Sequence, residues 1–549
     1  MMRPPGAFLR ACTDFSRPEH ISLPRLLGSL VLLMVLCFLL SPVTGRGLWI
    51  DETMAMANYP LASVGAGFAP LPFYAQAAPG VYSLFLSALA NWPPETIRLI
   101  QIGVVLGLIL TACLLVRAPW IVTFCVLLLG LQQGEFIRYA SELKYYGLET
   151  ASVFACTTWL IARPLSRPFQ AVDALGLLAL ASCGNVALLY AVICLFVVIG
   201  LCWSLHGMRT REVPWIGLTL LGCVVLYGLA LRGVAVQVHN YPQAYQNRGW
   251  TDLTFAASVM TAPLSKASLA LFLVLAVAGG LLRNHMHMAR WLLASVLLLM
   301  SLAVLIWLGT YPASHIRYFI ALYGVFLAFP LAAMLDAEHG EATLRNVGAA
   351  GLVALVLLGS AQQSLSTLKD VWRDPHLFEQ DDNLALVTWL NDQPATDVVL
   401  WHGAQPTIAY YTRHMPGLGK HRYLYELNSM TGKVAPELFD AAFRNQDYQQ
   451  VSARVERAIA LPGAWSRFVS VYSIYGDFSG PAEAMLKNAP QNAPFLIAAS
   501  RMHGEITRDS TDTRTSGLLK ALDQTGCDWL VALSARKVFV LRASCRAQE

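Results

Sequence analysis

Charged residues are scarce in this sequence. Asp, Glu, Lys and Arg together make up 13% of the 549 residues, about half the ~25% that is usual in soluble domains. Hydrophobic residues make up 56%, which excludes an ordinary soluble protein. The net charge of +5 is spread over loops with no basic block, so we expect no nucleic acid as a partner. The composition predicts an integral membrane protein surrounded by membrane lipids.

The first long apolar run, around residues 27–40, lacks a following cleavage site of the A-x-A kind, so we expect it to remain as a span. With a cytoplasmic N-terminus, about eleven spans place the arginine-bearing loops on the cytoplasmic side. These spans lie near residues 22–42, 96–116, 119–133, 148–163, 169–182, 185–205, 213–233, 264–282, 291–310, 316–335 and 346–363. The outer side then receives residues 43–95, 134–147, 234–263 and 311–315.

One apolar stretch is too short for a span. Residues 79–92, "PGVYSLFLSALANW", have the length expected of an interfacial helix. Counting this stretch as a span would move Arg117, Arg163 and Arg167 to the outer side and break the charge pattern. We therefore predict an interfacial helix here.

Long apolar runs end at about residue 363. The sequence thus divides into a transmembrane domain, residues 1–363, and a domain of ordinary size outside the membrane, residues 364–549. Strand patterns at 397–401 and 467–475, with a helical pattern at 481–489, predict an α/β fold.

Eight of the eleven cysteines lie in or beside apolar runs, where they are typical packing residues: Cys37, Cys113, Cys125, Cys156, Cys183, Cys194, Cys202 and Cys223. Cys527 and Cys545 instead flank a predicted hairpin that turns near residues 534–536. Mirror positions about that turn place the two at nearly the same level, which favours a disulfide in an oxidising, extracytoplasmic compartment. Two unpaired buried thiols are the alternative.

Two adjacent carboxylates, Asp51 and Glu52, follow the first span directly. Carboxylates are costly inside a bilayer, so they gather at the ends of spans and in water-filled cavities. Asp51 could simply cap the helix predicted after it. A cap requires neither a second acid nor the preceding aromatic residue, so we favour a functional site.

The second outer loop also concentrates ionisable groups. If residues 132–151 form one helix, Arg138, Glu142, Tyr145 and Glu149 share a face, with Lys144 and Tyr146 beside it. A surface ion pair between Arg138 and Glu142 is the simpler alternative.

A third polar cluster, His315, Arg317 and Tyr318, stands at the outer entrance of a span. A guanidinium here suits an anionic group at the membrane surface, and a snorkelling anchor is the rival explanation. Together the three clusters place acids, phenols and cations on one membrane face. This combination indicates a group transfer from an anionic lipid, with a carboxylate as base and cations for a leaving phosphate.

The order of these motifs resembles the GT-C superfamily of polyprenyl-phosphate-dependent glycosyltransferases, especially protein O-mannosyltransferases and lipid A aminoarabinose transferases. The resemblance rests on "WIDE" at residues 49–52, "AAPGVYSLFLSAL" at 77–89, "RYASELKYYGLE" at 138–149 and "RYFI" at 317–320. The chain departs from the aminoarabinose transferases in the first loop, where "YAQAAPGVY", residues 74–82, replaces an "EKPP"-like segment.

The resemblance implies a GT-C-like fold in a bacterial inner membrane, with the C-terminal domain periplasmic. It also implies inverting transfer of one sugar from a polyprenyl-phosphate donor to a hydroxyl of a lipid, glycan or protein acceptor of the cell envelope. Asp51 would be the general base, with Glu52 and Glu142 positioning the acceptor or a metal. The donor would be bound by the remaining site residues: Arg138, Lys144, Tyr145, Tyr146, His315, Arg317 and Tyr318.

A divalent ion, held by Asp51 and Glu142, stays open as a cofactor, although the sequence has no D-x-D motif or tight His cluster. Two rival functions also stay open. A lipid-linked glycan flippase should show internal repeats and polar residues in mid-span, and neither is evident. An oligosaccharyltransferase or ligase would move a whole lipid-linked glycan instead of one sugar.

Overall fold

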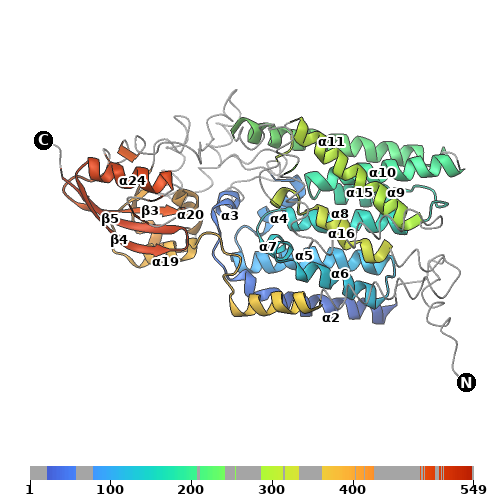
Figure 1. Cartoon of the computed structure of the whole chain (residues 1–549), viewed down its shortest axis with the longest axis horizontal. Coiled ribbons are helices and arrows are strands. Elements are labelled where there is room, and N and C mark those ends of the chain that lie inside the picture. The colour runs from blue at the N-terminus through green and yellow to red at the C-terminus, as the bar shows by residue number, and fades with distance from the viewer. Residues whose placement is uncertain are drawn as a thin grey trace, which may run out of the picture.

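The structure, a computed structural model, describes residues 22–56, 78–206, 210–240, 254, 286–308, 310–312, 316–332, 361–401, 403–412, 414–425, 482–483, 486, 489–500, 502, 506–507, 510 and 512–546. A bundle of helices forms one half of the molecule, and a mixed sheet with its helices forms the other (Figure 1). The structure therefore confirms both parts of the predicted fold, the helical bundle and the C-terminal α/β domain.

The helical half has the following elements: α2 (Leu23–Leu40), η1 (Ser41–Thr44), α3 (Ile50–Met56), α4 (Gly80–Leu89), α5 (Pro94–Leu115), α6 (Trp120–Gln132), α7 (Gly134–Ser141), α8 (Tyr146–Ala162), α9 (Ala171–Ala181), α10 (Asn185–His206), α11 (Val213–Asn240), α15 (Met286–Trp307), η4 (Ile316–Tyr318) and α16 (Leu322–Leu327). The stretch predicted as an interfacial helix is helical as α4.

Five helices among the described residues are long and apolar enough to span a membrane: Leu23–Thr44, Pro94–Leu115, Asn185–Ser204, Val213–Leu231 and His287–Trp307. A sixth span arises if α6 and α7, which meet at a bend of 86°, form one broken span. Helices α8, α9 and α16 lie where further spans are predicted but are shorter. The predicted spans at 264–282 and, for the most part, 346–363 fall outside the described residues, so the count of eleven stays a prediction.

Large apolar side chains remain exposed on the outer helices of the bundle. On α2 these include Leu23, Leu27, Val31, Met34 and Phe38. Exposed apolar surface on this scale is unfavourable in water, whereas hydrocarbon accommodates it at no cost. The exposed faces therefore fit a lipid environment.

Helix α8 occupies the centre of the bundle, among α5, α10, α15 and α16 (Figure 1). Its close approach to α16 requires a glycine, because a Cβ on Gly324 would collide with the backbone of α8 at Thr150 and Phe154. Close packing at this crossing fixes η4, and with it Arg317, at one end of the bundle.

The C-terminal domain contains one five-stranded sheet in the order β2-β1-β3-β5-β4. Strand β1 (Asp397–Leu400) pairs in parallel with β2 (Arg422–Tyr425) and β3 (Pro494–Ser500), and β3 continues antiparallel to β5 (Val538–Cys545), which pairs with β4 (Cys527–Ala535). Its helices are α19 (Asn383–Asp392), α20 (Ala404–Tyr411), η5 (Pro416–Lys420) and α24 (Thr513–Gln524). The strand predicted at 397–401 is β1, whereas the predicted strand at 467–475 and most of the predicted helix at 481–489 lie outside the described residues.

The two faces of this sheet have different neighbours. One face, with Val399, Ile497 and Leu541, packs under α24 in a core of its own. The opposite face shares a single hydrophobic core with α3 and α4 of the helical half, through Val398, Leu496 and Val540. The C-terminal domain is therefore packed against the first loop of the helical half as in a protein interior.

A helix over residues 361–373 crosses the predicted domain boundary at 363/364. It lies along α2 and α6, where Trp372 Nε1 donates to the Leu39 carbonyl at 2.9 Å and Ser364 Oγ to the Leu128 carbonyl at 2.7 Å. The division into two domains stays a prediction, with this helix as the physical link.

Strands β4 and β5 form the predicted hairpin, in which Cys527 stands opposite Cys545 and a disulfide joins them. The two cysteines are 18 residues apart in sequence. A bridge over a loop of this length stabilises a fold by about 3 kcal/mol in the chain-entropy account.

We predict that Cys527→Ser with Cys545→Ser lowers the free energy of unfolding of the C-terminal domain by about 3 kcal/mol, because the unfolded chain regains the freedom that the bridge removes. Pulse proteolysis of the full chain in urea, following the C-terminal fragment, measures this loss. Cys37→Ser, which alters a free cysteine on α2, is the control. Equal protection of the double variant and wild type would contradict the prediction.

Candidate functional site

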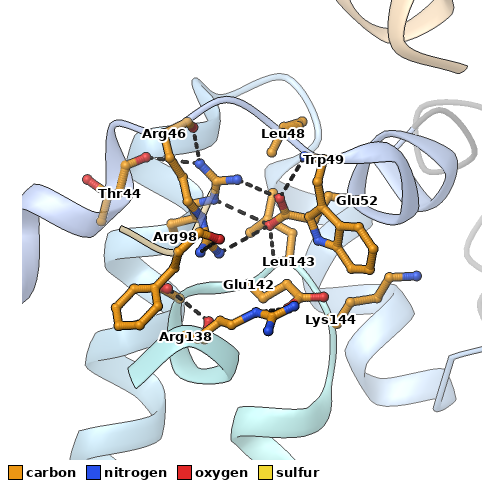
Figure 2. Close-up of polar contacts among 12 residues, drawn as sticks. Thr44, Arg46, Leu48, Trp49, Glu52, Arg98, Arg138, Glu142, Leu143 and Lys144 are labelled. Atoms are coloured by element: carbon orange, nitrogen blue, oxygen red, sulfur yellow. Dashed lines mark hydrogen bonds and ion pairs between the residues drawn. The ribbon is translucent and has the colours of Figure 1, made fainter. Parts of the chain in front are cut away.

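Glu52, on α3, is fully buried and makes an ion pair with Arg98 of α5, with 2.6 Å between Oε2 and Nη2 (Figure 2). It also accepts the backbone N–H of Leu143 at 2.7 Å and that of Trp49 at 3.3 Å. Burial alone would raise the pKa of Glu52, but the guanidinium groups of Arg98 and Arg46 outweigh burial and hold the pKa below its usual value. Glu52 is therefore charged and fully engaged with the protein.

Arg98 extends this network into the first loop. Its guanidinium donates to the backbone carbonyls of Thr44, Arg46 and Gly47 (Figure 2). Arg46 stands 3.9 Å from Glu52 on the other side, and burial beside Arg98 lowers the pKa of Arg46 to about 10. No sequence signal marked Arg98 as part of the site, because a lone arginine at the start of an apolar span is usually an interfacial anchor.

The second loop is not one helix, so the prediction for residues 132–151 is wrong. Helix α7 ends at Ser141, Glu142 is extended with φ −80° and ψ 134°, and α8 begins at Tyr146. Tertiary hydrogen bonds stabilise the non-helical segment between α7 and α8. Gln101 of α5 donates to the carbonyls of Ala140 and Glu142, and the Leu143 N–H donates to the Glu52 carboxylate. Arg138, Glu142, Tyr145 and Glu149 therefore do not share one helix face.

Asp51 forms the second ion pair, with 2.5 Å between its Oδ2 and Nη1 of Arg317. Nη2 of Arg317 donates to the Tyr318 hydroxyl at 3.3 Å, whereas the buried Nε has no hydrogen-bond partner among the described residues. Lys144 is buried within electrostatic reach of Asp51: burial lowers the pKa of Lys144, and the Asp51 carboxylate acts against that change. Three segments far apart in sequence thus bring one carboxylate and two cations together.

Glu142 is a buried carboxylate without a hydrogen bond to either oxygen in the described part of the chain. Its nearest ion pair is with Arg138, at 3.8 Å between Oε2 and Nε (Figure 2). Burial raises the pKa of Glu142 to about 7, although Arg138 acts in the opposite direction. A carboxyl group with this pKa can hold or release a proton near neutral pH.

Tyrosine rings surround the Asp51–Arg317 pair. Tyr146 has its ring centroid 4.6 Å from Tyr145, 6.3 Å from Tyr318 and 5.6 Å from Tyr139. The Arg317 guanidinium lies 5.1 Å from the ring centroid of Tyr318. Most of the predicted site residues therefore gather here, whereas His315 lies outside the described residues. Glu149 instead points into the bundle and accepts the Val186 N–H at 2.7 Å.

The C-terminal domain holds the backbone immediately before Asp51. The N–H groups of Gly47, Leu48 and Ile50 donate to Glu379 Oε1, the Tyr411 hydroxyl and Asp381 Oδ2, and Asn383 Nδ2 donates to the Leu48 carbonyl. The donor–acceptor distances of these four hydrogen bonds lie between 2.8 and 3.3 Å. No sequence signal marked these residues, because a polar run after the last span reads as a solvated linker.

The residues that the structure describes around Asp51 and Glu142 do not form a site for a divalent ion. In the described ranges no group of three or more His, Cys, Asp or Glu side chains converges. The two predicted ligands, Asp51 and Glu142, each face a guanidinium group instead. We therefore derive no step through a metal.

No protein-family model and no curated protein matches this chain. Two solved structures are similar to it: crystal structures of ArnT from Cupriavidus metallidurans bound to undecaprenyl phosphate and in the apo state. Each is 12% identical, and each match covers 94% of this chain and 98% of that chain, with TM-scores of 0.48 and 0.49. Because both TM-scores are below 0.5, the function proposed below rests on the residues of this chain.

We predict that Arg98→Met destabilises the protein by about 3 to 5 kcal/mol, because it leaves the buried Glu52 charge without its partner. Thermal unfolding of the detergent-purified protein measures the loss. Arg98→Met combined with Glu52→Gln should be more stable than Arg98→Met alone, since neither charge of the Glu52–Arg98 pair then remains. Strictly additive losses in the double variant would contradict this account of the pair.

The raised pKa of Glu142 predicts a pH-dependent stability. Between about pH 4.5 and about pH 7 the folded protein binds more protons than the unfolded chain, so wild type should lose stability relative to Glu142→Gln as the pH rises. This loss of stability of wild type relative to Glu142→Gln should reach its full size, no more than about 3 kcal/mol, above about pH 7. It should be absent below about pH 4.5. Melting temperatures from pH 5 to pH 8 test this, with the exposed Glu95→Gln as a control for removing one negative charge. A pH-independent difference would refute the assignment.

Proposed function

We propose that this protein is an inverting glycosyltransferase. It moves one sugar from a polyprenyl-phosphate carrier to a hydroxyl of a lipid, glycan or protein at the outer face of the inner membrane. The observation that carries the proposal is the convergence of Asp51, Lys144 and Arg317 from three loops at one end of an apolar bundle. A lipid-anchored phosphate must lie at this level, because its tail stays in the bilayer. The polyprenyl nature of the carrier comes from the family that the motifs resemble.

Asp51 is the general base in this proposal. The acceptor hydroxyl oxygen forms a bond to the anomeric carbon of the sugar from the face opposite the phosphate, and its proton passes to the Asp51 carboxylate. The bond from the anomeric carbon to the phosphate oxygen breaks, and the electron pair leaves with the phosphate. Attack opposite to the leaving group inverts the anomeric configuration.

Arg317 and Lys144 stabilise the leaving phosphate. The Nε of Arg317, which has no hydrogen-bond partner in the described part of the chain, is available to the phosphate. Two cations with fixed positions favour the phosphate dianion that forms as the bond breaks, which is the main source of rate in such a step. Tyr145, Tyr146 and Tyr318 give the sugar and the first isoprene units an aromatic wall.

Glu52 takes a different role from the catalytic one that the sequence analysis gave it. Every contact of Glu52 is to Arg98, Arg46 or a backbone N–H of the loops, so we assign it to positioning. Glu142 stands beside Arg138 and can exchange a proton near neutral pH. It is the second candidate for contact with the acceptor.

We predict that Asp51→Asn lowers sugar transfer by at least about a hundredfold, because the acceptor loses its base, while the protein level in the membrane is unchanged. Membranes are supplied with radiolabelled polyprenyl-phosphate sugars, and label on endogenous acceptors is measured. Glu95→Gln, an exposed acid at the start of α5, is the matched control and should transfer at the wild-type rate.

Equal transfer by Asp51→Asn and wild type would remove Asp51 from the mechanism. If wild type transfers label from none of the single-sugar donors, the single-sugar proposal fails. A donor that carries a whole glycan, and movement of that lipid across the membrane, would then be measured in the same membranes.

A further inference from the structure

A cavity of about 410 Å³ lies between the helical half and the C-terminal domain. Trp49, Arg317 and α7, through Glu135 and Arg138, line one side. The segment 377–380 and the β4–β5 turn, Arg536 and Lys537, line the other. The volume falls within the range of small-molecule sites.

Positive charge dominates the side chains that line this cavity. They include four cations, Arg138, Arg317, Arg536 and Lys537, and two carboxylates, Glu135 and Glu379. Arg138 pairs with Glu135 at 3.2 Å and Arg317 pairs with Asp51, while Glu379 accepts the Gly47 N–H at 3.0 Å and contacts His376 at 2.9 Å. Arg536 and Lys537 keep the sum of the lining charges positive. The lining therefore favours an anionic ligand.

The turn that supplies two of these cations is fixed in place. Its carbonyl groups accept backbone N–H groups from outside the hairpin: Asp382 donates to Arg536 and Met502 to Lys537, both at 2.9 Å. Asp382 also caps α19, accepting the Ala385 N–H at 3.0 Å. The C-terminal domain thus presents Arg536 and Lys537 to the cavity from a rigid support.

Lys537 adopts a backbone conformation that is unfavourable for a lysine. Its φ of +57° lies in the left-handed region, where glycine or asparagine is ordinary in a two-residue hairpin turn. Strained residues of this kind cluster at binding sites, because the rest of the structure holds them for their side chains. The unfavourable backbone conformation supports a functional role for the Lys537 side chain.

The cavity reaches the catalytic pair through Arg317, which lines it and binds Asp51. The indole N–H of Trp49, two residues before Asp51, is buried without a hydrogen-bond partner among the described residues and can donate to a ligand. Arg317 and Trp49 therefore connect the cavity, on the side of the C-terminal domain, with the segment that carries Asp51.

We propose that this cavity is the acceptor subsite and that Arg536 and Lys537 bind an anionic group of the acceptor, a phosphate or a carboxylate. The inference rests on the proposed function and deepens it. It gives the C-terminal domain a direct part in choosing the substrate.

The first test needs no sugar transfer. Purified full-length protein is treated with an amine-acetylating reagent, and modification of Lys537 is followed by mass spectrometry with and without inorganic diphosphate. We expect diphosphate to slow acetylation of Lys537 several-fold, to leave the exposed Lys420 of η5 unchanged, and to have less effect in Arg536→Gln. Equal rates at Lys537 with and without diphosphate would overturn the subsite.

The second test uses Lys537→Gly, which removes the cation and suits the left-handed backbone better. We expect a melting temperature no lower than that of wild type, together with an initial rate of label transfer to endogenous acceptors about tenfold lower. The donor concentration for half-maximal transfer should not change. Arg536→Gln should behave alike, whereas Arg542→Gln, an exposed arginine on β5 outside the cavity, should match wild type.

The outcomes separate the two proposals. A higher half-saturating donor concentration in Lys537→Gly would show that the cavity takes the phosphate of the donor, which overturns the acceptor assignment. Unchanged transfer in both Lys537→Gly and Arg536→Gln would also overturn it while leaving the glycosyltransferase function intact. If wild type transfers no sugar, the function fails, and the diphosphate experiment still decides whether the cavity binds anions.

Discussion

The buried ion pair between Glu52 and Arg98 is the constraint on which the site depends. Both side chains are fully buried, and taking two charges out of water costs more than an ordinary contact returns. The pair is therefore better explained by what it positions than by the stability it adds. It joins the first loop, through the carbonyls of residues 44, 46 and 47, to α5 and to the Leu143 N–H of the second loop. Asp51 is the neighbour of Glu52 in sequence, and Lys144 is the neighbour of Leu143.

The C-terminal domain completes this arrangement from the other side. Its sheet shares a hydrophobic core with α3, and Glu379, Asp381, Asn383 and Tyr411 satisfy the backbone of residues 47–50. Backbone groups buried in a loop require such partners, because a lost hydrogen bond there is costly. The loop that carries Asp51 is thus shaped by two halves of the chain more than 300 residues apart in sequence. A site built in this way cannot be complete in the helical half alone.

The sequence was informative where one residue type or one period decides the structure. Apolar runs predicted the helices, strand patterns predicted β1 and the hairpin, and acids, phenols and cations marked the loops that meet. The break between α7 and α8 was missed because Gln101 and Glu52, distant in sequence, override a good local helix pattern. Arg98 and the residues that hold the first loop were missed for the same reason. Their roles exist only in tertiary contacts.

Two adjacent carboxylates follow the first span because they serve different partners. Successive residues of a helix point about 100° apart, so Glu52 turns inward to Arg98 while Asp51 turns to Arg317. Both also lie in the first turn of α3, where the helix dipole favours negative charge, so a role in starting the helix and a role in catalysis are compatible. Glu52 fixes the helix, and the fixed helix sets the direction of Asp51. In the proposed function Asp51 must reach the acceptor hydroxyl beside a donor that is held by its lipid tail, which requires that direction to be fixed.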